Sequence, residues 1–175
     1  IKNAPELDDT RYPEYVAETI TDLHLELKKN TLVLFTANSM LKAVWEILRG
    51  QNRLDSKSIL AQGISGTRQN LLEQFKQNSK MILLGADSFW EGIDAPGEAC
   101  EIVIIPRLPF PVPTHPVTQA VAKRFESIGG ESFFSYSVPE AIIRFRQGSG
   151  RLIRSPLDTG ALIVLDSRII HKGYG

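Results

Sequence analysis

The chain has 175 residues, 42% of them hydrophobic, and its 20 basic and 20 acidic side chains give a formal net charge of zero. This length suits one domain with a single core, and this hydrophobic content disfavours disorder. No run approaches the ~20 apolar residues that span a bilayer, which predicts no membrane association, and zero net charge excludes a nucleic-acid-binding signature spread over the whole surface.

Residues 1–13 contain prolines and are interpreted as a linker from a preceding domain, whereas residues 14–175 are expected to form one domain. The sequence starts with Ile1 rather than Met and shows no signal peptide. We therefore expect a piece of a longer, cytoplasmic protein.

Helical and strand-like patterns alternate along the rest of the chain. A helical pattern runs from about Tyr15 to Lys28, and the pair Ser137 and Glu140, with Pro139 between them, predicts a capping box at the start of a later helix. Short apolar runs typical of strands buried on both faces occupy residues 31–36, 59–62, 80–84, 101–105 and 161–166. Further helical patterns lie around residues 41–48, 71–75, 117–125 and 142–145.

This alternation predicts an α/β fold with a parallel sheet and helices on both faces. In such sheets, ligands bind at the carboxyl ends of the strands. Polar or Gly/Pro-rich segments follow three of the predicted strands, at residues 36–39, 85–94 and 106–111. We expect these three loops to gather on one edge of the sheet.

The chain has few cysteine and histidine residues that could bind a metal ion. The single cysteine, Cys100, excludes an internal disulfide and any cysteine-rich metal or iron–sulfur site within this piece, and a small buried thiol is expected there. His24, His115 and His171 match no metal-ligand spacing. We therefore predict no metal site and no iron–sulfur cluster in this chain.

The segment 147–154, Gln-Gly-Ser-Gly-Arg-Leu-Ile-Arg, is the sharpest candidate for phosphate chemistry. Arg151 and Arg154 are three residues apart and would face the same way on a helical turn. Guanidinium groups suit phosphate oxygens because they donate several hydrogen bonds and remain charged. Gly148 and Gly150 would let the backbone approach a partner closely. The alternative is that both arginines are ordinary surface charges, which composition alone favours.

A second candidate is the turn that holds Glu91, Gly92 and Asp94. The glycine between two carboxylates would allow close approach to a ribose or a phosphate, and the acids could orient arginines or act as a catalytic pair. The alternative is a solvated turn in which Trp90 fills the core. Spacing alone favours that alternative.

One strand-end loop and the start of one helix are candidates for DNA contacts. Thr36, Asn38 and Ser39 follow the first strand, where hydroxyl and amide groups either cap a helix or bind a backbone phosphate. Arg68, which opens another helix, could add a phosphate contact, or it could serve solubility alone.

The loop after the fourth strand carries Arg107 and Phe110 among several prolines. An exposed Phe110 could stack on a base, which holds single strands without regard to sequence. The same loop could instead contact a neighbouring domain.

Taken together, these segments resemble the C-terminal RecA-like domain of superfamily 2 helicases, and they are most similar to the DinG branch of the DinG/XPD family. Residues 32–39 resemble motif IV, residues 88–94 with Pro96 and Gly97 resemble motif V, and residues 147–154 resemble motif VI; residues 108–111 resemble the family's proline-rich loop. Motif IV departs from the family pattern at Asn38, where relatives often carry an aromatic residue.

The resemblance implies a three-layer RecA-like fold and a role for each motif. Arg154 and Arg151 are the implied arginine-finger candidates, and Gln147 would face ATP beside them. The implied nucleotide-binding residues are Glu91, Gly92, Asp94, Gly148 and Gly150. The implied DNA-binding residues are Thr36, Asn38, Ser39, Arg68, Ser88, Arg107 and Phe110.

The resemblance also implies partners. The chain has no G-x-x-x-x-G-K-[S/T] phosphate loop, so ATP with Mg²⁺ would be held mainly by the N-terminal motor domain of the same protein. Single-stranded DNA is the expected nucleic acid, and a monomer is the expected state. On its own the piece should bind ATP weakly and hydrolyse none.

Two other functions remain open. In some DinG-like proteins an exonuclease domain precedes the motor, and ATP and DNA binding would then regulate a 3′–5′ exonuclease rather than drive unwinding. A non-catalytic nucleic-acid-binding module with a degenerate motor fold is the second alternative. The paired Arg151 and Arg154 argue against a degenerate motor.

Overall fold

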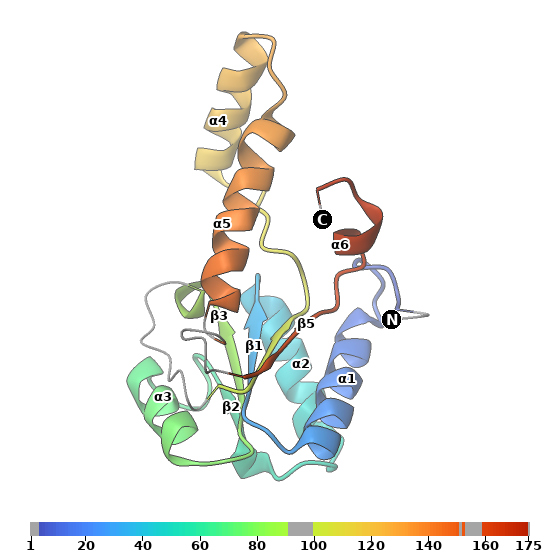
Figure 1. Cartoon of the computed structure of the whole chain (residues 1–175), viewed down its shortest axis with the longest axis vertical. Coiled ribbons are helices and arrows are strands. Elements are labelled where there is room, and N and C mark those ends of the chain that lie inside the picture. The colour runs from blue at the N-terminus through green and yellow to red at the C-terminus, as the bar shows by residue number, and fades with distance from the viewer. Residues whose placement is uncertain (1–3, 91–99, 151, 153–158, 175) are drawn as a thin grey trace.

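A computed structural model describes residues 4–90, 100–150, 152 and 159–174. Among these residues, five strands form one parallel sheet in the order β2-β3-β1-β4-β5, as the sequence predicts. Figure 1 shows the sheet with its strands pointing toward the long helical projection. The strands are β1 (Thr31–Phe35), β2 (Ile59–Ala61), β3 (Ile82–Ala86), β4 (Ile102–Ile105) and β5 (Ala161–Val164).

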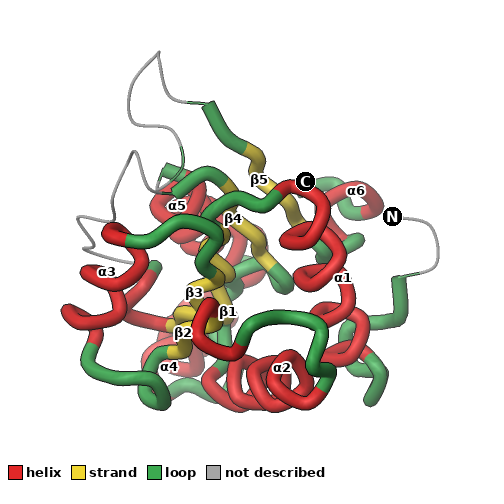
Figure 2. The backbone as a smooth tube through the Cα atoms, turned by 90° about the horizontal axis from the view of Figure 1, so that it is seen from below, coloured by secondary structure: helices red, strands yellow, loops and turns green. Residues whose placement is uncertain are grey.

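Helices cover both faces of the sheet, with α1 and α2 on one side and α3 and α5 on the other (Figure 2). This layering confirms the predicted α/β architecture. None of the described helices is long and apolar enough to cross a membrane. The helices are α1 (Tyr12–Leu27), α2 (Asn38–Gly50), α3 (Arg68–Gln77), α4 (Pro116–Ser127), α5 (Val138–Ser149) and α6 (Arg168–His171).

The central strand β1 shows why apolar runs were a good strand signal. Side chains alternate between the two faces of a strand, and here both faces are covered. Val33 and Phe35 pack in the core with α1 and α2, whereas Leu32 and Leu34 pack in the core with α3. The outer strand β5 departs from the prediction of full burial, since Ala161 and Leu162 are exposed. Among the described strands, β5 lies at the edge of the sheet and pairs with β4.

Helix α1 begins at Tyr12, three residues earlier than the sequence pattern predicts. The Tyr12 ring is buried, and its hydroxyl donates a hydrogen bond of 2.6 Å to the carbonyl of Pro106. Burial of the ring raises the pKa of Tyr12 well above its usual range. The first turn of α1 is thereby attached to the loop that follows β4.

The predicted capping box at Ser137 is wrong. Ser137 has helical backbone angles and makes no side-chain cap, because a single π-helical turn, Phe133–Ser137, runs directly into α5. The N–H of Val138 donates to the carbonyl of Phe133. Helical carbonyls already satisfy the N–H groups that a cap would serve, so none is needed.

Helices α4 and α5 form a hairpin that rises beyond the carboxyl ends of the strands (Figure 1). The lower half of α5 packs on the sheet, whereas α4 lies beside α5 away from it. Several apolar side chains on this projection are exposed, including Val117, Phe134 and Ile143.

Asp166 fixes the chain immediately after β5. It is fully buried and accepts hydrogen bonds from the N–H of Leu108 at 2.9 Å and from the guanidinium of Arg168 at 2.6–3.2 Å. Burial alone would raise its pKa, but the Arg168 guanidinium and the Leu108 N–H outweigh burial and hold the pKa of Asp166 below its ordinary value. The loops after β4 and β5 are therefore joined through one carboxylate.

We predict that Asp166→Asn lowers the free energy of unfolding by about 2–3 kcal/mol at pH 7, because it removes a buried charge with several donors. The depressed pKa means that this stabilisation is present above the pKa of an unfolded aspartate, about 3.9, and is lost as the pH falls through the lower folded-state value. Urea unfolding from pH 7 down to pH 3 measures both effects. The matched control is Asp9→Asn, whose partner Arg11 is exposed. An equal loss in both variants at pH 7 would contradict the prediction.

Candidate functional site

The loops after β1, β2 and β3 meet at the carboxyl edge of the sheet, as predicted for the first and third of them. We call this set of residues the carboxyl rim. It consists of Thr36, Asn38, Ser39, Gln62, Arg68, Asp87 and Ser88, which lie together through side-chain contacts or as neighbours in the chain.

Asn38 and Asp87 join the first loop to the third. The Asn38 side-chain amide donates a hydrogen bond of 3.1 Å to Asp87 Oδ2. Asp87 has a φ of +36°, an unusual angle for a residue other than glycine. Backbone held in such a region concentrates at functional sites, so Asp87 is a candidate in its own right.

Gln62 joins the second loop to the third. Its Oε1 accepts from the N–H of Ala86 at 2.7 Å, and its Nε2 donates to Ser88 Oγ at 3.3 Å. Both groups of one amide side chain are thus used to hold the turn that follows β3. Ser88, a predicted DNA contact, is exposed within this turn.

Arg68 opens α3, as predicted, and its guanidinium lies 5.8 Å from the centre of the Phe89 ring. The helix is capped by Thr67, whose hydroxyl accepts from the N–H of Asn70. Arg68 is exposed. The positively charged side chain of Arg68 therefore lies at the rim, beside the turn that carries Asp87 and Ser88.

The start of α2 leaves backbone donors available to a ligand. Its N-cap is Ala37, which makes no side-chain cap, and the first intrahelical bond runs from Leu41 to Ala37. The alternative that Thr36, Asn38 or Ser39 caps this helix is therefore wrong, since Asn38 and Ser39 lie inside the first turn. N–H groups at a helix start, together with the helix dipole, suit a phosphate.

Trp90 connects the rim to the end of α5. Its indole Nε1 donates a buried hydrogen bond of 2.7 Å to the carbonyl of Phe35, the last residue of β1. A Cβ built on Gly148 would lie 2.8 Å from the Trp90 ring and 2.9 Å from Leu34. Glycine at position 148 therefore allows the last turn of α5 to press against Trp90 and β1.

The segment that resembles motif VI begins on this last turn of α5. Gln147 and Gly150 are exposed there, whereas Gly148 is buried against Trp90. Leu152 is buried in the core that contains Trp90. The two predicted arginines, Arg151 and Arg154, lie outside the described residues, as do Glu91, Gly92 and Asp94.

The structure does not bring Arg107 to the rim. Its guanidinium lies 5.7 Å from the centre of the Tyr12 ring, and it lines a polar pocket with Glu6 and Asp8. The side chain emerges toward the N-terminal part of the chain, because α1 is attached to the same loop through Tyr12 and Pro106. The side chains around Arg107 do not support a DNA contact, which stays a prediction.

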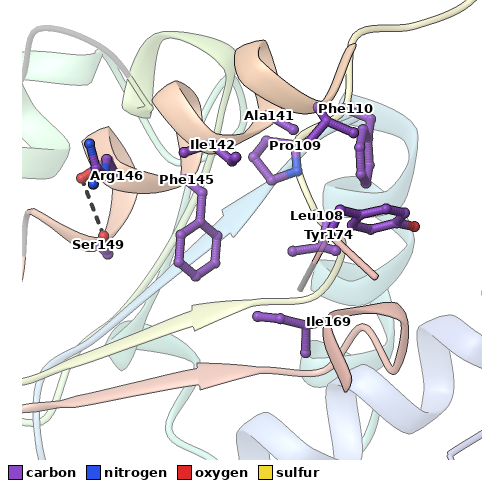
Figure 3. Close-up of a pocket in the computed structure, with 11 residues that line it drawn as sticks. Leu108, Pro109, Phe110, Ala141, Ile142, Phe145, Arg146, Ser149, Ile169 and Tyr174 are labelled. Atoms are coloured by element: carbon purple, nitrogen blue, oxygen red, sulfur yellow. Dashed lines mark hydrogen bonds between the residues drawn. The ribbon is translucent and has the colours of Figure 1, made fainter. Parts of the chain in front are cut away.

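Phe110 lies in an aromatic cluster beside an apolar pocket of about 310 Å³ (Figure 3). Phe133 stacks against it with ring centres 5.7 Å apart, Tyr174 meets it edge-on at 5.3 Å, and Arg168 lies over the ring at 5.3 Å. A base that stacks on Phe110 would have to displace one of these neighbours. The pocket itself lies between α5, the loop after β4 and the end of the chain.

Within the described part of the chain, no group of three or more His, Cys, Asp or Glu side chains is placed to hold a metal ion. Cys100 is buried, as predicted, and its thiol contacts the carbonyl of Ile102.

Comparison with known proteins identifies the family of the chain. The helicase C-terminal domain family matches residues 20–175. The chain belongs to this family. Among curated relatives of this helicase domain, the 3′-5′ exonuclease DinG of Bacillus subtilis is 41% identical over 99% of the chain, and the ATP-dependent DNA helicase YoaA of Haemophilus influenzae is 39% identical over 85%. These relatives confirm the resemblance to DinG.

The helicase domain spans 19% of the length of that DinG and 22% of that YoaA, so it corresponds to about a fifth of such proteins. Among solved structures, an XPD helicase superposes with a TM-score of 0.70 at 20% identity, covering 95% of this chain and 30% of that one. This likeness confirms the RecA-like arrangement of sheet and helices predicted from the motifs.

Three residues of the site were missed or misjudged from the sequence. Gln62 was interpreted as the end of a strand, and Asp87 as part of a loop with no role of its own. Trp90 was expected to fill the core, which it does, but its indole N–H also fixes the end of β1. The signal for Asp87 was its position just before the segment resembling motif V, and the signal for Trp90 was its place inside that segment. Gln62 offered no signal, because its two bonds join loops distant in sequence.

We predict that Gly148→Ala destabilises the domain by about 1–3 kcal/mol, because the added methyl group overpacks Trp90 and Leu34. Gly50→Ala is the matched control, since α2 is open there, with no atom within 4 Å of the added carbon. Alanine favours a helix, so the control should be neutral or slightly stabilising. Thermal unfolding of both variants measures the difference. Similar unfolding midpoints would show that α5 does not press on Trp90.

Proposed function

We propose that the chain is the second motor domain of an ATP-dependent DNA helicase of the DinG kind. In the full-length protein it would supply the arginine finger to ATP and part of the track for single-stranded DNA. The observation that carries the proposal is the contact path from the end of α5 through Trp90 to the carboxyl rim. A motor needs such a path, because ATP binding must change the grip on DNA.

The nucleotide half of the proposal rests on the segment that begins at Gln147. Gln147 is exposed at the end of α5, next to the buried Gly148. Arg151 and Arg154 follow in sequence and are proposed to reach the phosphates of ATP held with Mg²⁺ on the preceding motor domain. A guanidinium at the γ-phosphate stabilises the charge that develops in the transition state. Glu91, Gly92 and Asp94 are proposed to join this nucleotide site to the rim.

The DNA half rests on the carboxyl rim. The first N–H groups of α2, the side chains of Asn38 and Ser39, and the Arg68 guanidinium offer donors along one edge. Phosphate contacts of this kind position a strand without reading its sequence. We propose that a single strand lies along this edge, that the full-length protein acts as a monomer, and that it works in the cytoplasm.

When the two motor domains close on ATP, movement at the end of α5 would be passed to Trp90. Trp90 holds the carbonyl of Phe35 directly before Thr36, and Asp87, in the turn between β3 and Trp90, holds Asn38. Trp90 and Leu34 pack closely against Gly148, so there is no free space to absorb a movement of α5. The movement is therefore transmitted to these side chains. The grip on one phosphate would then shift along the strand.

A second candidate function comes from one relative. The Bacillus subtilis protein, 41% identical to this chain, is named a 3′-5′ exonuclease. In a protein of that kind, the same ATP and DNA sites would control a nuclease domain rather than drive unwinding. A nuclease assay on the full-length protein, with and without ATP, separates the two functions.

We predict that Arg154→Ala in the full-length protein lowers DNA-stimulated ATP hydrolysis by about 10³-fold or more. The matched control is Arg146→Ala, which removes an exposed arginine from the same end of α5 but lies outside the motif-VI segment. Steady-state hydrolysis with and without single-stranded DNA gives the comparison. Unchanged hydrolysis in Arg154→Ala would rule out the finger.

We further predict that Arg68→Ala weakens binding to single-stranded DNA equally for all sequences. Loss of one phosphate contact reduces the slope of log Kd against log salt concentration by about 1. Lys57→Ala is the control, because Lys57 precedes β2 and so lies at the opposite edge of the sheet. Fluorescence anisotropy titrations at several salt concentrations measure the slope. Equal slopes in the two variants would place the DNA away from the rim.

A further inference from the structure

A cleft of about 370 Å³ lies beside the carboxyl rim, between the strand-end loops and the α4–α5 hairpin. Thr36 and Asp87 form its wall on the rim side, and Tyr136 and Glu140 line it from the hairpin. Its remaining lining comes from Phe110, Pro111, Val112, His115, Val117, Thr118 and Arg144. The cleft is therefore built by segments from four separate parts of the chain.

The lining is a poor match to a phosphate. Two carboxylates, Asp87 and Glu140, line the space together with Arg144 and His115. Carboxylate oxygens accept hydrogen bonds and repel a phosphodiester. The donors suited to phosphate stand instead at the rim, at the start of α2 and on Arg68.

The lining is a good match to a nucleobase. Val112 and Val117 are 56% and 57% exposed, and the half-buried Tyr136 adds an aromatic side chain. A flat base would cover this apolar and aromatic surface. Carboxylates at its edge accept from exocyclic amino groups, which adenine, cytosine and guanine carry and thymine lacks.

The cleft also opens where a nucleotide would be held. Asp87 belongs to both the rim and the cleft, since its Oδ2 accepts from Asn38 and its side chain lines the cavity. Thr36 is likewise shared. A strand whose phosphate rests on the start of α2 therefore has the cleft beside it, within reach of one of its bases.

We infer that this cleft binds one unstacked base of the single strand and that Asp87 and Glu140 select a base with an exocyclic amino group. The inference rests on the proposed function, because it requires a single strand along the rim. It adds a sequence preference at one position of a track that otherwise grips phosphates. Glu140 is the specificity-determining residue, and Asp87 joins this selection to the phosphate grip through Asn38.

The test uses the full-length protein and oligodeoxythymidylate of the length that the protein covers. A single dC is placed at each position in turn, and Kd is measured by fluorescence anisotropy. Cytosine and thymine are close in size and differ in the amino group that the carboxylates would accept. At one position, dC should bind about five- to tenfold more tightly than dT.

Two variants assign that preference to the cleft. Glu140→Ala removes the acceptor, and Glu140→Gln keeps the size but presents either an oxygen or an NH₂ group, so it serves dC and dT alike. Both should reduce the preference to less than about twofold while leaving the affinity for plain oligodeoxythymidylate within about threefold. Glu126→Ala, on the exposed side of α4, is the matched control and should keep the full preference.

The outcomes separate this inference from the proposed function. Equal Kd values at every position, or a preference that survives both Glu140 variants, would overturn the base-binding cleft. If oligodeoxythymidylate still stimulates ATP hydrolysis in that case, the proposed motor function stands without the cleft. A full-length protein that neither binds the oligonucleotide nor hydrolyses ATP in its presence would overturn both.

Discussion

The hydrogen bond from the Trp90 indole to the carbonyl of Phe35 is the contact on which the rest of the site depends. It is buried, and it fixes the point where the central strand ends and the first polar loop begins. The same ring is the surface on which Gly148 and the last turn of α5 rest. One side chain therefore sets the distance between the helix that leads to the motif-VI arginines and the loop that begins α2.

The carboxyl rim begins where the hydrogen bond from Trp90 fixes the end of β1. Parallel strands end at one edge, so the loops that follow them converge there. Short side chains then fix the loops to each other, through Asn38 with Asp87 and through Gln62 with the turn after β3. The unusual φ of Asp87 is the local cost of turning the chain so soon after β3.

The side of the sheet formed by β4 and β5 is held by other contacts. The buried Asp166 carboxylate binds the loop after β4 to the residues after β5, and Tyr12 binds the same loop to α1. These contacts set the path of residues 106–111, with Arg107 turned toward Tyr12 and Phe110 into its aromatic cluster. The sequence predicted that Arg107 and Phe110 contact DNA from the same loop, but their side chains have different neighbours.

The sequence by itself determined the strands, the parallel α/β fold and the family, because buried strands carry continuous apolar runs and because motifs are local strings. It also placed Arg68 correctly at the start of a helix. Only the tertiary structure decided which loops touch, that Ser137 needs no cap, and that Asp87, Gln62 and Trp90 form part of the site. Those contacts join residues far apart in the chain, such as Phe35 and Trp90, which are 55 positions apart. Packing and hydrogen bonding in three dimensions select them, and no local pattern records these contacts.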